Sequence, residues 1–109
     1  MKLECAGSIS SGNATEAEVR RAFADDGGRG EFIMLSQADE MYIQAAGEAD
    51  DPYVMEYREG SDDRHFECTR ELKKSEAEAA FLKYLKGDST WKTDFQWKKQ
   101  EKKPWWKFW

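Results

Sequence analysis

Four strand-length segments follow one another in the middle of the chain, and this run constrains the fold more than any other feature. Short polar connections separate the segments, which are Glu31–Ser36, Met41–Ala46, Tyr53–Arg58 and His65–Arg70. The third segment alternates clearly, so that Tyr53, Met55 and Tyr57 share one face of a strand. Because consecutive strands joined by short connections usually pair with each other, the run predicts an antiparallel β-meander.

A helix is expected before this meander. Thr15 is followed three residues later by Glu18, which is the spacing of a capping box at a helix N-terminus. Val19, Ala22 and Phe23 then fall on one helical face. Asp26–Gly28 marks the end of this helix.

A second helix is expected after the meander. Ser75 and Glu78 repeat the capping-box spacing, and Gly87 supplies the residue after the helix C-cap. Between them, apolar side chains recur at helical spacing: Ala77, Ala80, Phe81, Tyr84 and Leu85.

The remaining segments complete a single α+β domain. Lys2–Ala6 is expected to form a short first strand, Gly7–Asn13 a loop, and Trp91–Lys98 either a short helix or a strand. The predicted fold is an antiparallel β-meander of about four to five strands packed against two helices. It occupies residues 1–97, and a basic, Trp-rich tail follows at residues 98–109.

The aromatic residues of the strands raise a second question, because a sheet with one open face could present them to a partner. Tyr42, Tyr53, Tyr57 and Phe66 are assigned one register, and the opposite register goes to Ile33, Leu35, Ile43 and Val54. Both faces are therefore expected to be partly covered. Core packing is the leading interpretation of these rings, and a partner-binding face is the alternative.

Composition places the chain among intracellular globular domains. Its 109 residues are 36% charged, but 14% are aromatic, which argues against disorder. The sequence has no apolar run of the length needed for a signal peptide or a membrane span. We therefore expect a cytoplasmic protein in which Cys5 and Cys68 are reduced and act as small apolar side chains.

No catalytic or metal-binding constellation can be assembled from these residues. His65 is the single histidine, and Cys68 three residues later would point to the opposite face of a strand. The acidic pairs Asp25/Asp26, Asp50/Asp51 and Asp62/Asp63 all fall in expected turns, where Asp is favoured for local hydrogen bonding. A zinc site needs about four nitrogen or sulfur ligands, and the chain has only one His and two Cys. We expect a protein that is not an enzyme and holds no metal or cofactor.

The C-terminal tail has the opposite charge to the body. Residues 98–109 contain five lysines, one glutamate and four aromatic rings, whereas residues 1–97 contain 12 Lys and Arg against 21 Asp and Glu. The candidate contact residues are Lys102, Lys103, Trp105, Trp106, Lys107, Phe108 and Trp109. Three roles remain open for them: packing back on the sheet, contact with an anionic membrane surface, and binding to a protein partner. The acidic body disfavours nucleic acid, and no pattern indicates an oligomeric state.

Residues 32–97 resemble small bacterial immunity-type proteins of polymorphic toxin systems. The similarity rests on Tyr42–Gly47, Tyr53–Arg58, Phe66, the Glu78–Gly87 helix, Trp91 and Trp97. The resemblance implies a non-enzymatic α+β protein that binds and blocks a toxin domain. An acidic body would then suit a basic partner through electrostatic complementarity. The alternative is a membrane-surface accessory protein that the Lys/Trp tail anchors.

Overall fold

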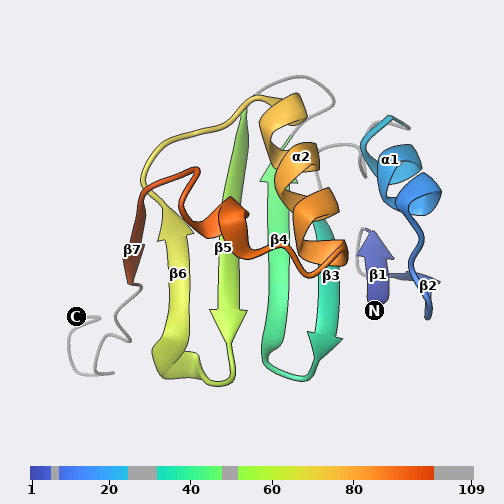
Figure 1. Cartoon of the computed structure of the whole chain (residues 1–109), viewed down its shortest axis with the longest axis horizontal. Helices are drawn as coiled ribbons and strands as arrows, with labels where there is room; N and C mark the ends of the chain where they lie inside the picture. The colour runs from blue at the N-terminus through green and yellow to red at the C-terminus, as the bar shows by residue number, and fades with distance from the viewer. Residues whose placement is uncertain (6–7, 25–31, 48–51, 100–109) are drawn as a thin grey trace, which may run out of the picture.

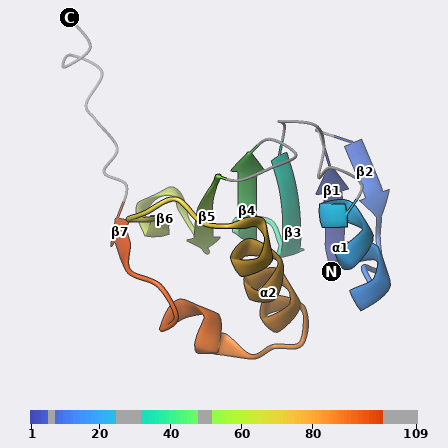
Figure 2. The same ribbon diagram turned by 90° about the horizontal axis from the view of Figure 1, so that it is seen from above.

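In the described part of the chain, a single antiparallel sheet carries two α-helices on one of its faces (Figure 1). The computed structural model describes residues 1–5, 8–24, 32–47 and 52–99. Seen from above, both helices lie on the same side of the strands (Figure 2). The predicted α+β class is therefore confirmed.

Within these described residues, seven strands make up the sheet, in the order β2-β1-β3-β4-β5-β6-β7. All neighbouring strands are antiparallel. The strands are β1 (Lys2–Cys5), β2 (Ser8–Ser11), β3 (Phe32–Ala38), β4 (Met41–Gly47), β5 (Tyr53–Glu59), β6 (His65–Cys68) and β7 (Trp97–Lys99). Strands β3 to β6 are the predicted meander.

The expected number of strands, four or five, was too low, because the edge strand β2 was not expected and the segment that contains the edge strand β7 was left open between helix and strand. Strand β2 lies in the segment Gly7–Asn13 that we expected to be a loop. Its sequence, Ser-Ile-Ser-Ser, has little apolar character, and it is defined by its pairing with β1. The ambiguous segment Trp91–Lys98 contains both kinds of structure, because the 3₁₀ helix η3 (Ser89–Lys92) precedes β7.

Helix α1 (Glu16–Ala24) begins as the capping box predicts. The Thr15 backbone N–H donates to Glu18 Oε1 at 3.0 Å, and the Glu18 backbone N–H donates to Thr15 Oγ1 at 3.2 Å. Val19 and Phe23 are buried on the inner face of this helix.

Helix α2 (Lys74–Leu85) begins earlier than expected. The predicted cap at Ser75 and Glu78 was wrong, because Ser75 lies inside the helix. Glu76 supplies the capping carboxylate instead and accepts a hydrogen bond from the Lys73 backbone N–H at 3.0 Å. The end of the helix is as predicted, since Gly87 has a φ of +78° and follows the C-cap residue Lys86.

One core lies between the sheet and the helices. Its largest fully buried side chains include Tyr53, Phe23 and Phe81, whose rings are in contact. Towards β7 the core continues as an aromatic cluster, in which Trp91 and Trp97 each meet the Tyr57 ring edge-on. Cys68 is buried, Cys5 is partly buried, and both are free thiols.

Strand register corrects the expected assignment of residues to the two faces. Ile33, Leu35 and Ile43 are buried on the same face as Tyr53 and Tyr57, rather than on the opposite one. Core packing of these two tyrosines is confirmed. Tyr42 and Val54 lie on the opposite side of the sheet, which no described helix covers.

Candidate functional site: the helix-free face of the sheet

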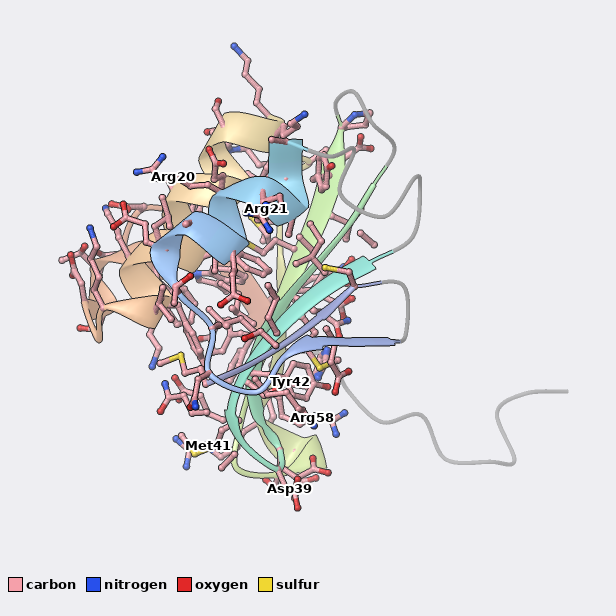
Figure 3. All side chains as sticks on the ribbon, turned by 90° about the vertical axis from the view of Figure 1, so that its right-hand side faces the viewer. Arg20, Arg21, Asp39, Met41, Tyr42 and Arg58 are labelled. Carbon is pink, nitrogen blue, oxygen red and sulfur yellow. The ribbon has the colours of Figure 1, made fainter. Side chains whose placement is uncertain are left out.

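The sheet face opposite the helices, called here the helix-free face, carries three rows of side chains that run across the strands. The anchor row consists of Lys2, Ser36, Tyr42, Arg58 and His65, each paired with the next. The carboxylate row lies beside it and consists of Glu4, Met34, Gln44, Glu56, Glu67 and Lys98. Ala46 and Val54 form the described part of a third, apolar row. Figure 3 shows Tyr42 and Arg58 on the other side of the sheet from Arg20 and Arg21 of α1.

His65 sits at the end of the anchor row and is only 6% exposed. Its Nε2 lies 2.7 Å from Glu56 Oε1, and its Nδ1 accepts a hydrogen bond from Arg58 Nε at 3.1 Å. Because a guanidinium can only donate, Nδ1 must be unprotonated in this arrangement. The proton then resides on Nε2 and is donated to Glu56.

Arg58 is held by several neighbours at once. Its Nη1 lies 2.6 Å from Glu40 Oε2, and its guanidinium carbon lies 5.5 Å from the centre of the Tyr42 ring. Glu40 occupies the two-residue turn between β3 and β4 with a φ of +63°, a conformation that costs energy for a residue other than glycine. A single guanidinium is therefore fixed by an imidazole, a carboxylate and an aromatic ring.

This geometry gives His65 an orienting role and not that of a base. Both ring nitrogens are engaged, so the neutral ring has no lone pair left to take a proton from a substrate. His65 lies across from Arg58 of β5, and its ring is buried. Cys68 faces the core opposite Trp97, and its predicted separation from His65 is confirmed.

Two carboxylates of the carboxylate row face each other across neighbouring strands. Glu56 and Glu67 are cross-strand partners on β5 and β6, and like charges in that position repel. Glu56 accepts two hydrogen bonds. One comes from His65 Nε2, and the other comes from Gln44 Nε2, which lies 3.1 Å from Glu56 Oε2. Glu67 is partly buried and makes no hydrogen bond or ion pair with any other residue that the structure describes. On its other side it faces Lys98 of β7.

An open groove of about 440 Å³ hollows the β1–β3–β4 end of this face. Its lining includes Lys2 and Glu4, which form an ion pair at 3.0 Å, together with Met34, Ser36 and Tyr42. A smaller cavity of about 160 Å³ lies at the end of α2 near Tyr84 and Trp91. Burial raises the pKa of Tyr84 to about 12, so that phenol stays neutral and acts as a packing group.

Most of the acidic pairs and the tail residues singled out above lie outside the described residues. This applies to Asp25/Asp26, Asp50/Asp51, Lys102, Lys103, Trp105, Trp106, Lys107, Phe108 and Trp109. Asp62 and Asp63 lie in the 3₁₀ turn η2 (Asp62–Arg64), as their turn chemistry predicts. Among the described parts of the chain, no group of three His, Cys, Asp or Glu could hold a metal ion.

The sequence did not reveal the cluster of Tyr42, Arg58 and His65. Period-2 alternation places each residue opposite a core position of its own strand. Which residues of different strands become neighbours depends on register, and no local pattern encodes it.

Comparison with protein-family models, with curated proteins and with solved structures found no match. The resemblance to immunity-type proteins stays a prediction from aromatic and glycine positions of the sequence. None of the helices in the described ranges combines the length and apolar character needed to cross a bilayer.

Proposed function

We propose that this protein is a non-enzymatic protein-binding domain whose contact surface is the helix-free face. The observation that carries the proposal is the fixed Tyr42–Arg58 pair, held by Glu40 and His65, on a sheet face without a described helix. Tyrosine and arginine are, with tryptophan, the residue types enriched among the side chains that dominate binding energy. Groups already fixed before binding lose little conformational entropy when a partner arrives.

The partner is proposed to be basic. Glu4, Glu56 and Glu67 share one row of the face, and Glu56 and Glu67 repel each other across two strands. A lysine or arginine from a partner placed over this row would relieve that repulsion. Neutralisation of a basic toxin domain, as the immunity-type resemblance implies, is a specific form of this role.

The test uses one charge reversal on the face and one matched reversal elsewhere. Glu67→Lys changes the carboxylate row, whereas Glu71→Lys makes the same change in the exposed connection before α2. The full chain and both variants serve as baits for binding partners at low and high salt, and retained proteins are identified by mass spectrometry. A basic protein retained by the wild type and by Glu71→Lys, but lost with Glu67→Lys, supports the proposal. Equal retention by both variants contradicts it.

A toxin-neutralising role also requires that the partner itself be toxic. The basic protein identified in this way should impair growth when it is expressed alone, and co-expression of the wild-type chain should restore growth. Glu67→Lys should fail to restore it, whereas Glu71→Lys should succeed. A partner without toxicity would leave the binding role standing and remove the immunity role.

The alternative function is a membrane-surface accessory protein anchored by its tail. The observation that favours it is β7, where the sheet ends in the exposed residues Lys98 and Lys99 and delivers the tail at one edge. Lysines near anionic lipid each contribute about 1 kcal/mol, and tryptophan rings favour the membrane interface. Co-sedimentation with anionic vesicles, but not with neutral ones, would support this function. Replacing Trp105, Trp106 and Trp109 with Ser should then abolish sedimentation.

A further inference from the structure

The carboxylate row of the helix-free face ends at the point where the tail begins. Lys98 of β7 is its last member and faces Glu67 of β6. The described chain stops one residue later, at Lys99. The ten remaining residues, Gln-Glu-Lys-Lys-Pro-Trp-Trp-Lys-Phe-Trp, carry three lysines, one glutamate and four aromatic rings.

These ten residues are long enough to cross the whole row. The row runs from β7 to β1 over five strand intervals, which at about 4.8 Å each amounts to about 24 Å. An extended chain of ten residues spans up to about 33 Å. Pro104 also disfavours helix at Lys103, which favours an extended path there.

The chemistry of the two surfaces is complementary. The row offers the carboxylates of Glu67, Glu56 and Glu4, of which Glu67 makes no hydrogen bond or ion pair with any described residue. Aromatic rings can also cover Met34, which belongs to the row, and Tyr42 and the 39% exposed Val54, which lie beside it. The segment 100–109 contains both lysines and aromatic rings, so both kinds of group on the face would find partners.

We propose that residues 100–109 bind across the helix-free face of their own chain, along the carboxylate row. The tail is then an intramolecular ligand for the surface that a basic protein would use. A partner must displace it to gain access, and a tail engaged with lipid leaves the face open. Tail binding does not depend on the partner-binding role, because it concerns only this chain.

Ring-current shifts in the NMR spectrum of the full chain test the proposal directly. Aromatic rings placed on the face should displace the methyl resonances of Met34 and Val54. The core methyls of Met55 and Ile43 point to the opposite side of the sheet and serve as internal controls. Replacing Trp105, Trp106 and Trp109 together with Ser keeps the chain length and removes three of the four rings. The Met34 and Val54 resonances should move in this variant, and the core methyls should not.

Electrostatics provides the second arm of the test. Glu67→Lys, or added salt, should move the Met34 and Val54 resonances in the same direction as loss of the rings. Glu71→Lys has the same charge change away from the face and should leave them in place. If the triple Trp→Ser variant left the Met34 and Val54 resonances unchanged, the proposal would be overturned. Shifts that disappear on dilution would assign the tail to a second copy of the chain and overturn it as an intramolecular contact.

Loss of tail binding and loss of partner binding have separate signatures. If the tail does not bind, the Met34 and Val54 methyl resonances are the same in the wild type and in the variant without the three tryptophans. Capture of a basic protein by the wild type would still depend on Glu67. If the tail does bind, removing its three tryptophans should increase partner capture, because the competing ligand is weakened.

Discussion

At the residue scale, His65 is the side chain whose replacement should reveal most about the helix-free face. His65→Leu keeps a similar volume but removes the acceptor for Arg58 Nε and the donor to Glu56 Oε1. Loss of such hydrogen bonds at a buried site costs about 1–3 kcal/mol. We predict that His65→Leu lowers the free energy of unfolding by this amount, as measured by denaturant titration. His65→Gln, which retains an amide donor and acceptor, should lose less, and equal losses would show that the contacts are not responsible.

Glu76 gives the fold a pH dependence with a predictable sign. Its hydrogen bond with Arg70, followed by that from the Lys73 backbone, lowers the pKa of this carboxyl from 4.5 to about 2. A group whose pKa is lower in the folded state stabilises the fold above its unfolded pKa. The contribution is therefore complete above about pH 4.5 and is lost as the pH falls towards 2. Because the Glu76 side chain is 32% exposed and Arg70 is 55% exposed, solvent screening keeps it below about 1 kcal/mol.

The measurement compares the stability of two Glu→Gln variants on the same helix. Glu76→Gln should be less stable than the wild type at pH 7, and the difference should shrink at pH 3. Glu78→Gln removes a neighbouring charge without touching the Arg70 contact and should show no such convergence. If the loss of stability caused by Glu76→Gln were the same at pH 7 and at pH 3, the ion-pair explanation would be contradicted.

At the element scale, the helices and strands that could be predicted from the sequence are those with a local sequence signal. Helix α1 was predictable because Thr15 and Glu18 exchange hydrogen bonds within four residues. Strands β3 to β6 were predictable because each is a segment of strand length between short polar connections, with clear alternation in β5. Strand β2 was missed because its few apolar atoms carry no alternation, and pairing with β1 alone defines it. The start of α2 was misplaced because Arg70, outside the helix, favours Glu76 as the capping carboxylate.

The same distinction applies to the candidate site. Arg58 and Tyr42 could be placed on their strands from the sequence, but their contact with each other requires the β4–β5 register. His65 joins them through the β5–β6 register. The basic charge and the aromatic rings of the tail are visible in the sequence alone. Its connection to the end of the carboxylate row required the position of β7 in the sheet.

The end of β4 provides a prediction about how two elements approach each other. A Cβ added at Gly47 would lie 2.7 Å from the Pro52 carbonyl oxygen and 2.9 Å from Tyr53 Cγ. Tyr53 is 1% exposed and packs against Phe23, so its ring has no room to move away. Overpacking of this kind costs about 1–3 kcal/mol, and Gly47→Ala should lose that much in thermal or denaturant unfolding.

Gly12 is the matched control for Gly47. A Cβ added there meets nothing within 4 Å. Gly12→Ala should therefore be neutral or gain up to about 1 kcal/mol, because alanine restricts the unfolded chain. If Gly12→Ala and Gly47→Ala had the same effect, the close approach at Pro52 and Tyr53 would not be the cause.

At the scale of the whole molecule, the sheet is expected to open from its edges towards its centre. Strand β4 pairs along its length with both β3 and β5, and its Ile43 and Ala45 are fully buried. Strand β2 has a single partner strand and a register irregularity in its pairing with β1. Strand β7 is also an edge, but the Trp97 ring contacts Tyr57 and its Nε1 donates to the Lys92 carbonyl at 2.9 Å. The two edges therefore differ in how firmly they are held.

Native-state hydrogen exchange should resolve this order. The amides of β2 should exchange first, those of β7 next and those of β4 last, because local opening requires less free energy where fewer contacts are broken. A tenfold difference in protection corresponds to about 1.4 kcal/mol of opening free energy, and we predict at least that interval between β2 and β4. Trp97→Leu should bring the exchange of β7 close to that of β2 and leave β4 in its place. Equal protection of all three strands would instead mean that the sheet opens only as one cooperative unit.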